Sequence, residues 1–289
     1  MSGVDRANGH KPAAISSLFH PALAGAPRPD PSKLAYDLNK ALSAVVPLQA
    51  RCPEDAFSAS YLGTEREGNA VQISEDGLLL TIGYLINECD LVTVGTRIGG
   101  VAEAKILAYD YETGFGLLRA QSDLGVGHLE LGSSSAIREG ETLTVGAHGG
   151  AAQALAAKVT SVREFAGYWE YLIPDAIFTE PPHPIWSGAA LIDESGKLVG
   201  IGSLFVQDAE EENAAKQPGN MFVPVDILKP IFETLLEKGQ TQHRPRPWLG
   251  IYTVETMGHL LITSVSERGP ALKAGIEPAT SPSASRRSP

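Results

Sequence analysis

The stretch of sequence that decides the fold is His183-Pro184-Ile185-Trp186-Ser187-Gly188-Ala189-Ala190-Leu191. It places one serine, Ser187, on a turn of small residues. Two apolar runs follow, at 191–193 and 198–201, with the polar turn Glu194-Ser195-Gly196-Lys197 between them. Apolar runs divided by such a turn predict a β-hairpin. A Ser-Gly pair alone is a generic turn signal, so the rest of the chain must decide whether Ser187 has chemistry.

Composition excludes several classes of protein. The chain has 289 residues, 43% of them hydrophobic, and a formal net charge of -11. That charge argues against a nucleic-acid surface, which needs clustered Lys and Arg. No apolar run is long enough to span a bilayer. Residues 1–30 are polar and lack the apolar core of a signal peptide, which predicts a cytoplasmic protein, or a periplasmic one if the start is wrongly assigned.

The cysteine count excludes two further kinds of site. Two cysteines, Cys52 and Cys89, are too few for a disulfide framework or a metal site. Their spacing leaves open whether they pair or remain buried thiols. We expect neither a metal nor a cofactor.

Short strands recur along most of the chain. The first series includes 70–73 and 78–82, joined by the strong hairpin signal Asp76-Gly77, then 91–94, 104–108 and 115–120. The second includes 128–132, 141–146, 156–162, 169–173, the serine hairpin and 221–225. A short helix is expected from Ser32 and a longer one from Asp226, as N-cap, to Lys238.

This pattern predicts an all-β protein with a duplicated barrel. We expect a disordered leader at 1–30, a first barrel at 31–127, a second with its closing helix at 128–239, and a linker, a partial domain and a disordered tail at 240–289.

These segments resemble those of the HtrA/DegP-like trypsin-fold serine proteases and follow one another in the same order. In that family a double six-stranded barrel precedes a PDZ domain. The stretches that carry the resemblance run from about Ala44 to Ile276, and include 68–81, 110–118, 131–141 and 222–226. The resemblance implies a serine protease site at Ser187, unfolded protein or peptide segments as partners, and possible homo-oligomers.

The same resemblance shows departures at the site. Tyr84 stands at the family's histidine position and Gly114 at its aspartate position. Ile185 replaces the glycine whose N–H, with that of Ser187, would form the oxyanion hole. A serine needs a neighbouring base, and the base needs an orienting group. A tyrosine is mostly protonated at neutral pH, and a β-branched residue resists a positive φ.

Three residues near the serine leave alternatives open. His183 is a candidate substitute base, although a loop histidine is usually solvated. His148 is expected to be a turn residue. Trp186 either fills a vacated pocket or is an exposed anchor for a peptide.

The C-terminal piece resembles the start of a PDZ domain, with Leu249, Gly250 and Ile251 at the peptide-binding loop. The match ends near Pro278, before a low-complexity tail. The sequence therefore favours a pseudoprotease that binds peptides or proteins. An active serine endopeptidase using Ser187 with a non-standard base is the alternative, and a decaying gene product a third.

Overall fold

The computed structural model describes Leu23 and residues 25–167, 172–207, 209, 217–241, 247–256 and 259–279. Contacts divide the chain into two compact units, 1–241 and 242–289. Among the described residues, no helix has both the length and the apolar character that a membrane span requires.

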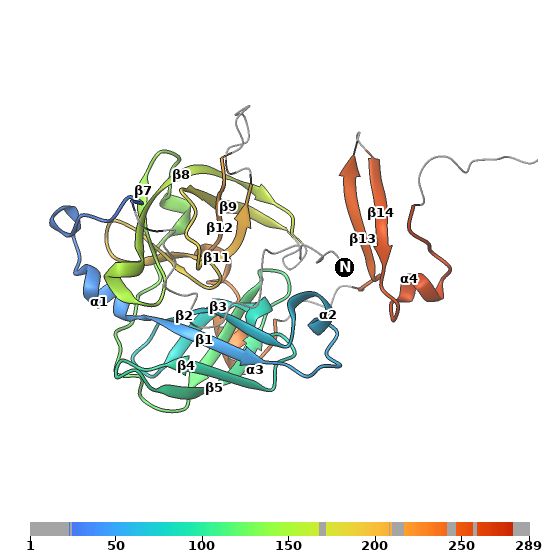
Figure 1. The fold of residues 1–289 in the computed structure, drawn as a ribbon, viewed down its shortest axis with the longest axis horizontal. Helices are drawn as coiled ribbons and strands as arrows, with labels where there is room; N and C mark the ends of the chain where they lie inside the picture. Colours follow the sequence, from blue (N-terminus) through green and yellow to red (C-terminus); the bar gives the residue numbers. More distant parts are fainter. Residues whose placement is uncertain are drawn as a thin grey trace, which may run out of the picture. The chain divides into compact units, whose positions relative to one another are not determined.

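The first barrel is closed and antiparallel, with the strand order β1-β2-β3-β6-β5-β4 (Figure 1). Its strands are β1 (Val45–Arg51), β2 (Glu65–Gln72), β3 (Leu78–Ile82), β4 (Leu91–Gly95), β5 (Val101–Tyr109) and β6 (Phe115–Ala120). The Asp-Gly turn joins β2 to β3 as predicted, with Val71 opposite Leu80. The helices α1 (Leu38–Ser43) and α2 (Ala59–Leu62) flank β1 in sequence.

The second barrel is also closed, in the order β10-β11-β12-β9-β8-β7. Its strands are β7 (Thr142–Gly146), β8 (Ala154–Phe165), β9 (Ile173–Glu180), β10 (Ala190–Ile192), β11 (Leu198–Val206) and β12 (Gly219–Pro224). The predicted all-β duplicated barrel is therefore confirmed, and the serine hairpin is β10–β11.

Two of the predicted strands differ in the structure. At 128–132 only Leu131 forms a bridge, to Leu198, so this segment is a connection between the barrels. The strand predicted at 169–173 begins at Ile173, and residues 168–171 lie outside the described residues.

One hydrophobic core spans both barrels. It joins residues of the first barrel such as Leu80 and Phe115 to residues of the second such as Phe178 and Ile201. A separate cluster within the second barrel includes Val145, Leu191 and Phe222. Burial of this kind stabilises the fold by about 1.5–3 kcal/mol for each large apolar side chain.

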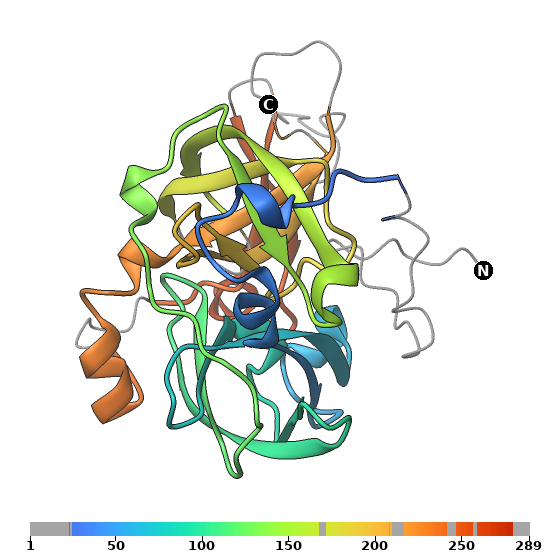
Figure 2. The same ribbon diagram turned by 90° about the vertical axis from the view of Figure 1, so that its left-hand side faces the viewer.

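The leader is ordered further toward the N-terminus than expected. Leu23 is buried in the cluster of the second barrel. The Arg28 guanidinium donates to the Ala152 and Ala154 carbonyls, and the Tyr36 hydroxyl donates to Thr144. Figure 2 shows this segment, in blue, running along the second barrel before α1. Residues 1–22 lie outside the described residues, so the rest of the expected leader stays a prediction.

The closing helix is shorter than the predicted 226–238. A 3₁₀ turn covers Val225–Ile227, and α3 covers only Phe232–Lys238. Pro230 explains the difference, because it lacks an N–H and its ring clashes with the carbonyl of residue i-4, here Asp226.

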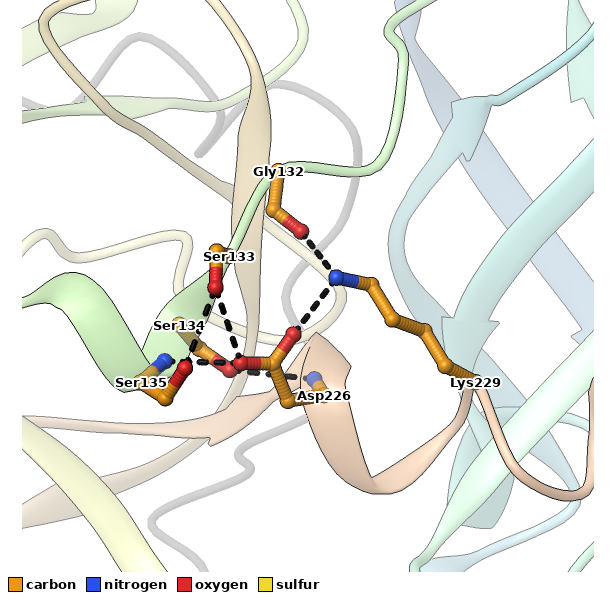
Figure 3. Close-up of polar contacts among 6 residues, drawn as sticks. All are labelled: Gly132, Ser133, Ser134, Ser135, Asp226 and Lys229. Carbon is orange, nitrogen blue, oxygen red and sulfur yellow. Dashed lines mark hydrogen bonds and ion pairs between the residues drawn. The ribbon is translucent and has the colours of Figure 1, made fainter.

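Asp226 is therefore not a helix cap and instead bonds the segment after β12 to the segment before β7 (Figure 3). Its carboxylate accepts from the Ser135 N–H at 2.8 Å and pairs with Lys229 at 2.6 Å. The Asp226 N–H donates to Ser134 Oγ, and Lys229 also donates to the Gly132 carbonyl. These contacts, named below the Asp226 clasp, join the start of the barrel to its end.

The second unit is a two-stranded hairpin, β13 (Ile251–Thr256) and β14 (His259–Val265), followed by α4 (Pro270–Lys273). Apolar side chains remain exposed on it, including Leu260 at 73%. Residues 242–246 and 280–289, which hold most of the expected linker and tail, lie outside the described residues.

Candidate active site

The serine loop, defined as residues 183–189, lies between β2 of the first barrel and β11 of the second. Gly188 has φ +72°, and a Cβ there would lie 2.0 Å from the Asn69 carbonyl. On the other side, a Cβ at Gly202 would lie 2.0 Å from the Trp186 carbonyl. Backbone contacts this close admit only glycine. The loop is held tightly, with Ser187 buried at 3% exposure.

Tyr84 lies against the serine, on the 3₁₀ turn η4 (Gly83–Leu85) after β3. Its hydroxyl is 2.9 Å from Ser187 Oγ and 2.6 Å from the Ser203 carbonyl. The Tyr84 hydroxyl donates toward both oxygens, Ser187 Oγ and the Ser203 carbonyl, and a phenol has only one proton to share between them. A phenol that keeps its proton cannot take another at neutral pH. Tyr84 therefore lies beside the serine without supplying a base.

Gly114 cannot orient a base. It lies in the turn between β5 and β6 at φ +78°, a conformation that aspartate adopts at a cost. Its carbonyl accepts from the Gly83 N–H at 2.6 Å, which fixes the turn that carries Tyr84. The nearby buried carboxylate, Asp110, accepts from the N–H and hydroxyl of Thr113.

His183 is fully buried, in contrast to the solvated position that is usual for a loop histidine. Its Nε2 lies 3.0 Å from the Gln153 carbonyl and therefore donates, which leaves Nδ1 to accept the Ile185 N–H at 3.0 Å. Burial lowers the pKa of His183 to about 4. Both ring nitrogens bond to backbone groups.

The oxyanion position is affected by the same bond. The N–H of Ile185, expected to be one donor of the hole, points to the His183 ring rather than outward. Ile185 also has no positive φ, since Glu88 is the one non-glycine residue with positive φ in the described part of the chain. A preorganised pair of donors is the usual basis of oxyanion stabilisation.

Asn69 links the two barrels at the site, and sequence reasoning missed it. It is fully buried on β2, its backbone N–H donates to the Ser187 carbonyl at 2.8 Å, and its amide donates to the carbonyls of Ser187 and Ile185. Its Oδ1 accepts from the N–H and Nδ1 of His148. The sequence carries no local signal for this role, because Asn69 lies among the mostly polar residues of β2.

Trp186 is half-buried, between the two alternatives left open by the sequence. Its ring lies 5.7 Å from that of Phe205, which is 42% exposed. Phe205 is on the part of β11 that extends beyond β10, because β10 pairs only with 198–201. An aromatic surface thus adjoins a strand edge next to Ser187.

A polar network bonds to the backbone of the turn that carries Tyr84. Arg66 is buried and donates to the Tyr84 and Asn87 carbonyls and to the Ser58 hydroxyl. Burial lowers the pKa of Arg66 to about 10. Glu88 accepts from the N–H and hydroxyl of Ser58. Cys52 and Cys89 form a disulfide next to this network, which answers the question left open by their spacing.

The expected peptide-binding loop of the second unit forms hydrogen bonds with other residues of the same unit. The carbonyls of Leu249 and Gly250 accept from Ala271 and Ser266, and Ile251 begins β13. In the described residues, no group of three or more His, Cys, Asp or Glu is arranged to hold a metal ion.

Comparisons with known proteins agree with this fold. The trypsin-like peptidase domain family matches residues 68–201. The serine endoprotease DegS of Haemophilus influenzae is 26% identical over 220 residues, which cover 73% of this chain and 62% of DegS. The serine protease Do-like HtrA of Bacillus subtilis is 24% identical over 85% of this chain and 61% of its own length. The chain thus spans about three fifths of these two relatives.

Solved structures show the same fold at lower identity. The HtrA-type protease AlgW with a tripeptide aligns with a TM-score of 0.56 and 22% identity, over 82% of this chain and 77% of that one. AlgW with a decapeptide aligns with a TM-score of 0.53 and 21% identity, over 84% and 83%.

Proposed function

We propose that this chain, a trypsin-fold homologue of the HtrA/DegP-like serine proteases, is a pseudoprotease that binds peptide segments without cleaving them. The observation that carries the proposal is the contact of Ser187 Oγ with the Tyr84 phenol, a hydrogen-bond donor that keeps its proton and cannot serve as a base at neutral pH. The His183 bond to the Ile185 N–H supports it at the oxyanion position. Removal of a whole catalytic triad lowers kcat by about a million-fold in a serine protease such as subtilisin.

Peptide binding is supported by the surface beside the serine. The edge of β11 at 204–206 extends past β10 and can pair with an extended backbone, and Trp186 and Phe205 offer an aromatic surface to its side chains. The AlgW structures hold a tripeptide and a decapeptide, which makes an unfolded polypeptide a reasonable ligand class. The homologous relatives are longer, so PDZ binding and assembly into homo-oligomers also stay proposals.

A fluorophosphonate probe tests the catalytic half of the proposal. The wild-type chain is expected to stay unlabelled at Ser187, at the level of Ser187→Ala. Labelling at Ser187 that Ser187→Ala abolishes would reject the pseudoprotease and favour an active endopeptidase with a non-standard base.

Fluorescence anisotropy with a labelled, reduced and carboxymethylated polypeptide tests the binding half. Phe205→Ser should weaken binding about tenfold, since a large apolar contact is worth about 1.5 kcal/mol or more. Phe57→Ser is the matched control, because Phe57 is exposed to a similar degree, 38% against 42%, in the turn before α2. Equal losses in the two variants would count against a site at β11.

A further inference from the structure

A groove lies away from the serine, at the junction of the two barrels. It has a volume of about 600 Å³, within the range of pockets that hold ligands. Its walls are the β2–β3 turn, the end of β6, the connection between the barrels and one face of α3. In Figure 2, α3 (orange) and the connection (green) lie on the same side of the molecule. Nothing in the serine site uses these residues.

The walls are fixed by backbone hydrogen bonds before any ligand arrives. In the β2–β3 turn, the Ile73 N–H donates to the Leu78 carbonyl at 2.9 Å. In the connection, the Leu129 N–H donates to Gln72 of the first barrel, and the Glu130 carbonyl accepts from Leu198 of the second. A preformed groove loses little conformational entropy on binding.

The groove combines an apolar floor with an acidic rim. The floor includes Leu131, Phe232 and Leu236, which are half-buried, and Ile73 and Leu78 beside them. The charged lining residues are Glu75, Asp76, Glu130 and Arg119. Three carboxylates against one guanidinium leave a formal charge of -2 on these four residues.

The three carboxylates of the groove differ in whether they already form an ion pair with a protein cation. Asp76 pairs with Arg119, and Glu130 pairs with Lys197 at 3.0 Å. Glu75 is exposed and forms no ion pair within the described part of the chain. A cation that enters the groove meets this carboxylate without displacing another partner.

We propose that this groove binds a cationic amphipathic peptide segment, one that combines Lys or Arg with large apolar side chains. The apolar side chains contact Phe232 and Leu236 on α3, and the cation lies at Glu75. The acidic rim and the net charge of -11 disfavour nucleic acid and acidic peptides. The site does not depend on the proposed function, because it shares no residue with the serine loop or β11.

The test is fluorescence anisotropy of three labelled twelve-residue peptides with the full chain. One alternates Leu and Arg, one alternates Leu and Glu, and one alternates Ser and Arg. The Leu/Arg peptide is expected to bind saturably and more weakly as salt is raised, and the other two at least about tenfold more weakly. If the Ser/Arg peptide binds as tightly as the Leu/Arg peptide, the interaction depends on charge alone and the proposal is overturned. Binding of the Leu/Arg peptide that does not saturate would also overturn it.

Charge reversal locates the site. Glu75→Lys should weaken binding of the Leu/Arg peptide about fivefold, an effect in the range of an exposed ion pair. Glu54→Lys reverses an exposed carboxylate that does not line the groove, and should have no effect. Equal losses in both variants overturn the assignment. Phe205→Ser, which tests the proposed peptide site at β11, should leave this binding unchanged, so the two proposals can fail separately.

Discussion

At the residue scale, the site is defined by what its polar groups already bond to. The Ser187 hydroxyl, the phenol of Tyr84 and the Ile185 N–H all have partners inside the protein. A reaction would have to break these bonds before it could begin. On the proposed function, placing one histidine at the site is therefore not enough for hydrolysis.

We predict that Tyr84→His will not restore hydrolysis. The new imidazole would have no carboxylate to orient it, because Gly114 is at φ +78° and Asp110 is bonded to Thr113. Turnover of a fluorogenic peptide library should stay at the level of the Tyr84→His/Ser187→Ala double variant. Activity in the single variant that the double variant lacks would show that an orienting group had been overlooked.

Stability should depend on the protonation of His183. Its pKa is about 4 in the folded protein and about 6.5 when unfolded, so between these values the unfolded chain binds more protons. The stabilisation is complete above about pH 6.5 and is lost as the pH falls toward 4, by at most roughly 3 kcal/mol. Urea unfolding of the wild type and His183→Gln at several pH values measures it. If the free energy of unfolding depends on pH equally in the wild type and in His183→Gln, the effect belongs to another group. His148 is one such group, because burial also lowers its pKa.

At the element scale, glycines that touch a facing backbone hold the serine loop in place. Gly188→Ala should destabilise the protein by about 3 kcal/mol or more, because it combines a positive φ with a Cβ 2.0 Å from the Asn69 carbonyl. Gly140→Ala is the control, since its φ is +88° and no atom lies within 4 Å of its Cβ. Denaturant midpoints of the two variants separate the clash from the strain. Equal midpoints would mean that the loop can move.

The Asp226 clasp predicts a dependence on acid. Partial burial opposes ionisation, but the bonds from Lys229 and Ser135 outweigh it and hold the pKa of Asp226 well below its usual range. Its stabilisation is therefore present above about pH 4 and is lost as the pH falls further. Asp226→Asn should cost about 1 kcal/mol at pH 7. Thermal melts measure this: the melting temperatures of the wild type and Asp226→Asn should differ less at pH 3 than at pH 7. Asp55→Asn, at an exposed position, should have the melting temperature of the wild type at both pH values.

The sequence predicted which strands and hairpins exist better than it predicted the length of the closing helix or the contacts of buried polar residues. The hairpins followed from Asp76-Gly77 and from the apolar runs after Ser187, because turn chemistry and alternation are local signals. The closing helix was predicted too long because Pro230 was not weighed against a good apolar face. Asn69 and the orientation of His183 depend on contacts with distant residues, such as His148 and Gln153, which no local pattern encodes.

At the scale of the whole molecule, the first unit should unfold as one body. Its main core contains residues of both barrels, and Asn69 joins them by hydrogen bonds. Calorimetry should show a single transition for residues 1–241. Two transitions within that unit would mean that the barrels are independent.

Reduction should lower that single transition rather than divide it. The Cys52–Cys89 disulfide closes a loop with a sequence separation of 37, and its loss should cost about 2–4 kcal/mol. A melt with and without a phosphine reductant measures the change, and the Cys52→Ser/Cys89→Ser double variant should match the reduced protein. An unchanged melt would show that the bond adds no stability.

The contact between Tyr84 and Ser187 also bears on how this lineage can change. A mutation of Tyr84 to histidine would break two buried bonds at once, and on the proposed function it would give no turnover until a carboxylate and an open amide were also in place. Each single step along that route is expected to lower stability without adding activity. On the proposed function, selection would therefore act on which peptides this chain binds more readily than on any gain of hydrolysis.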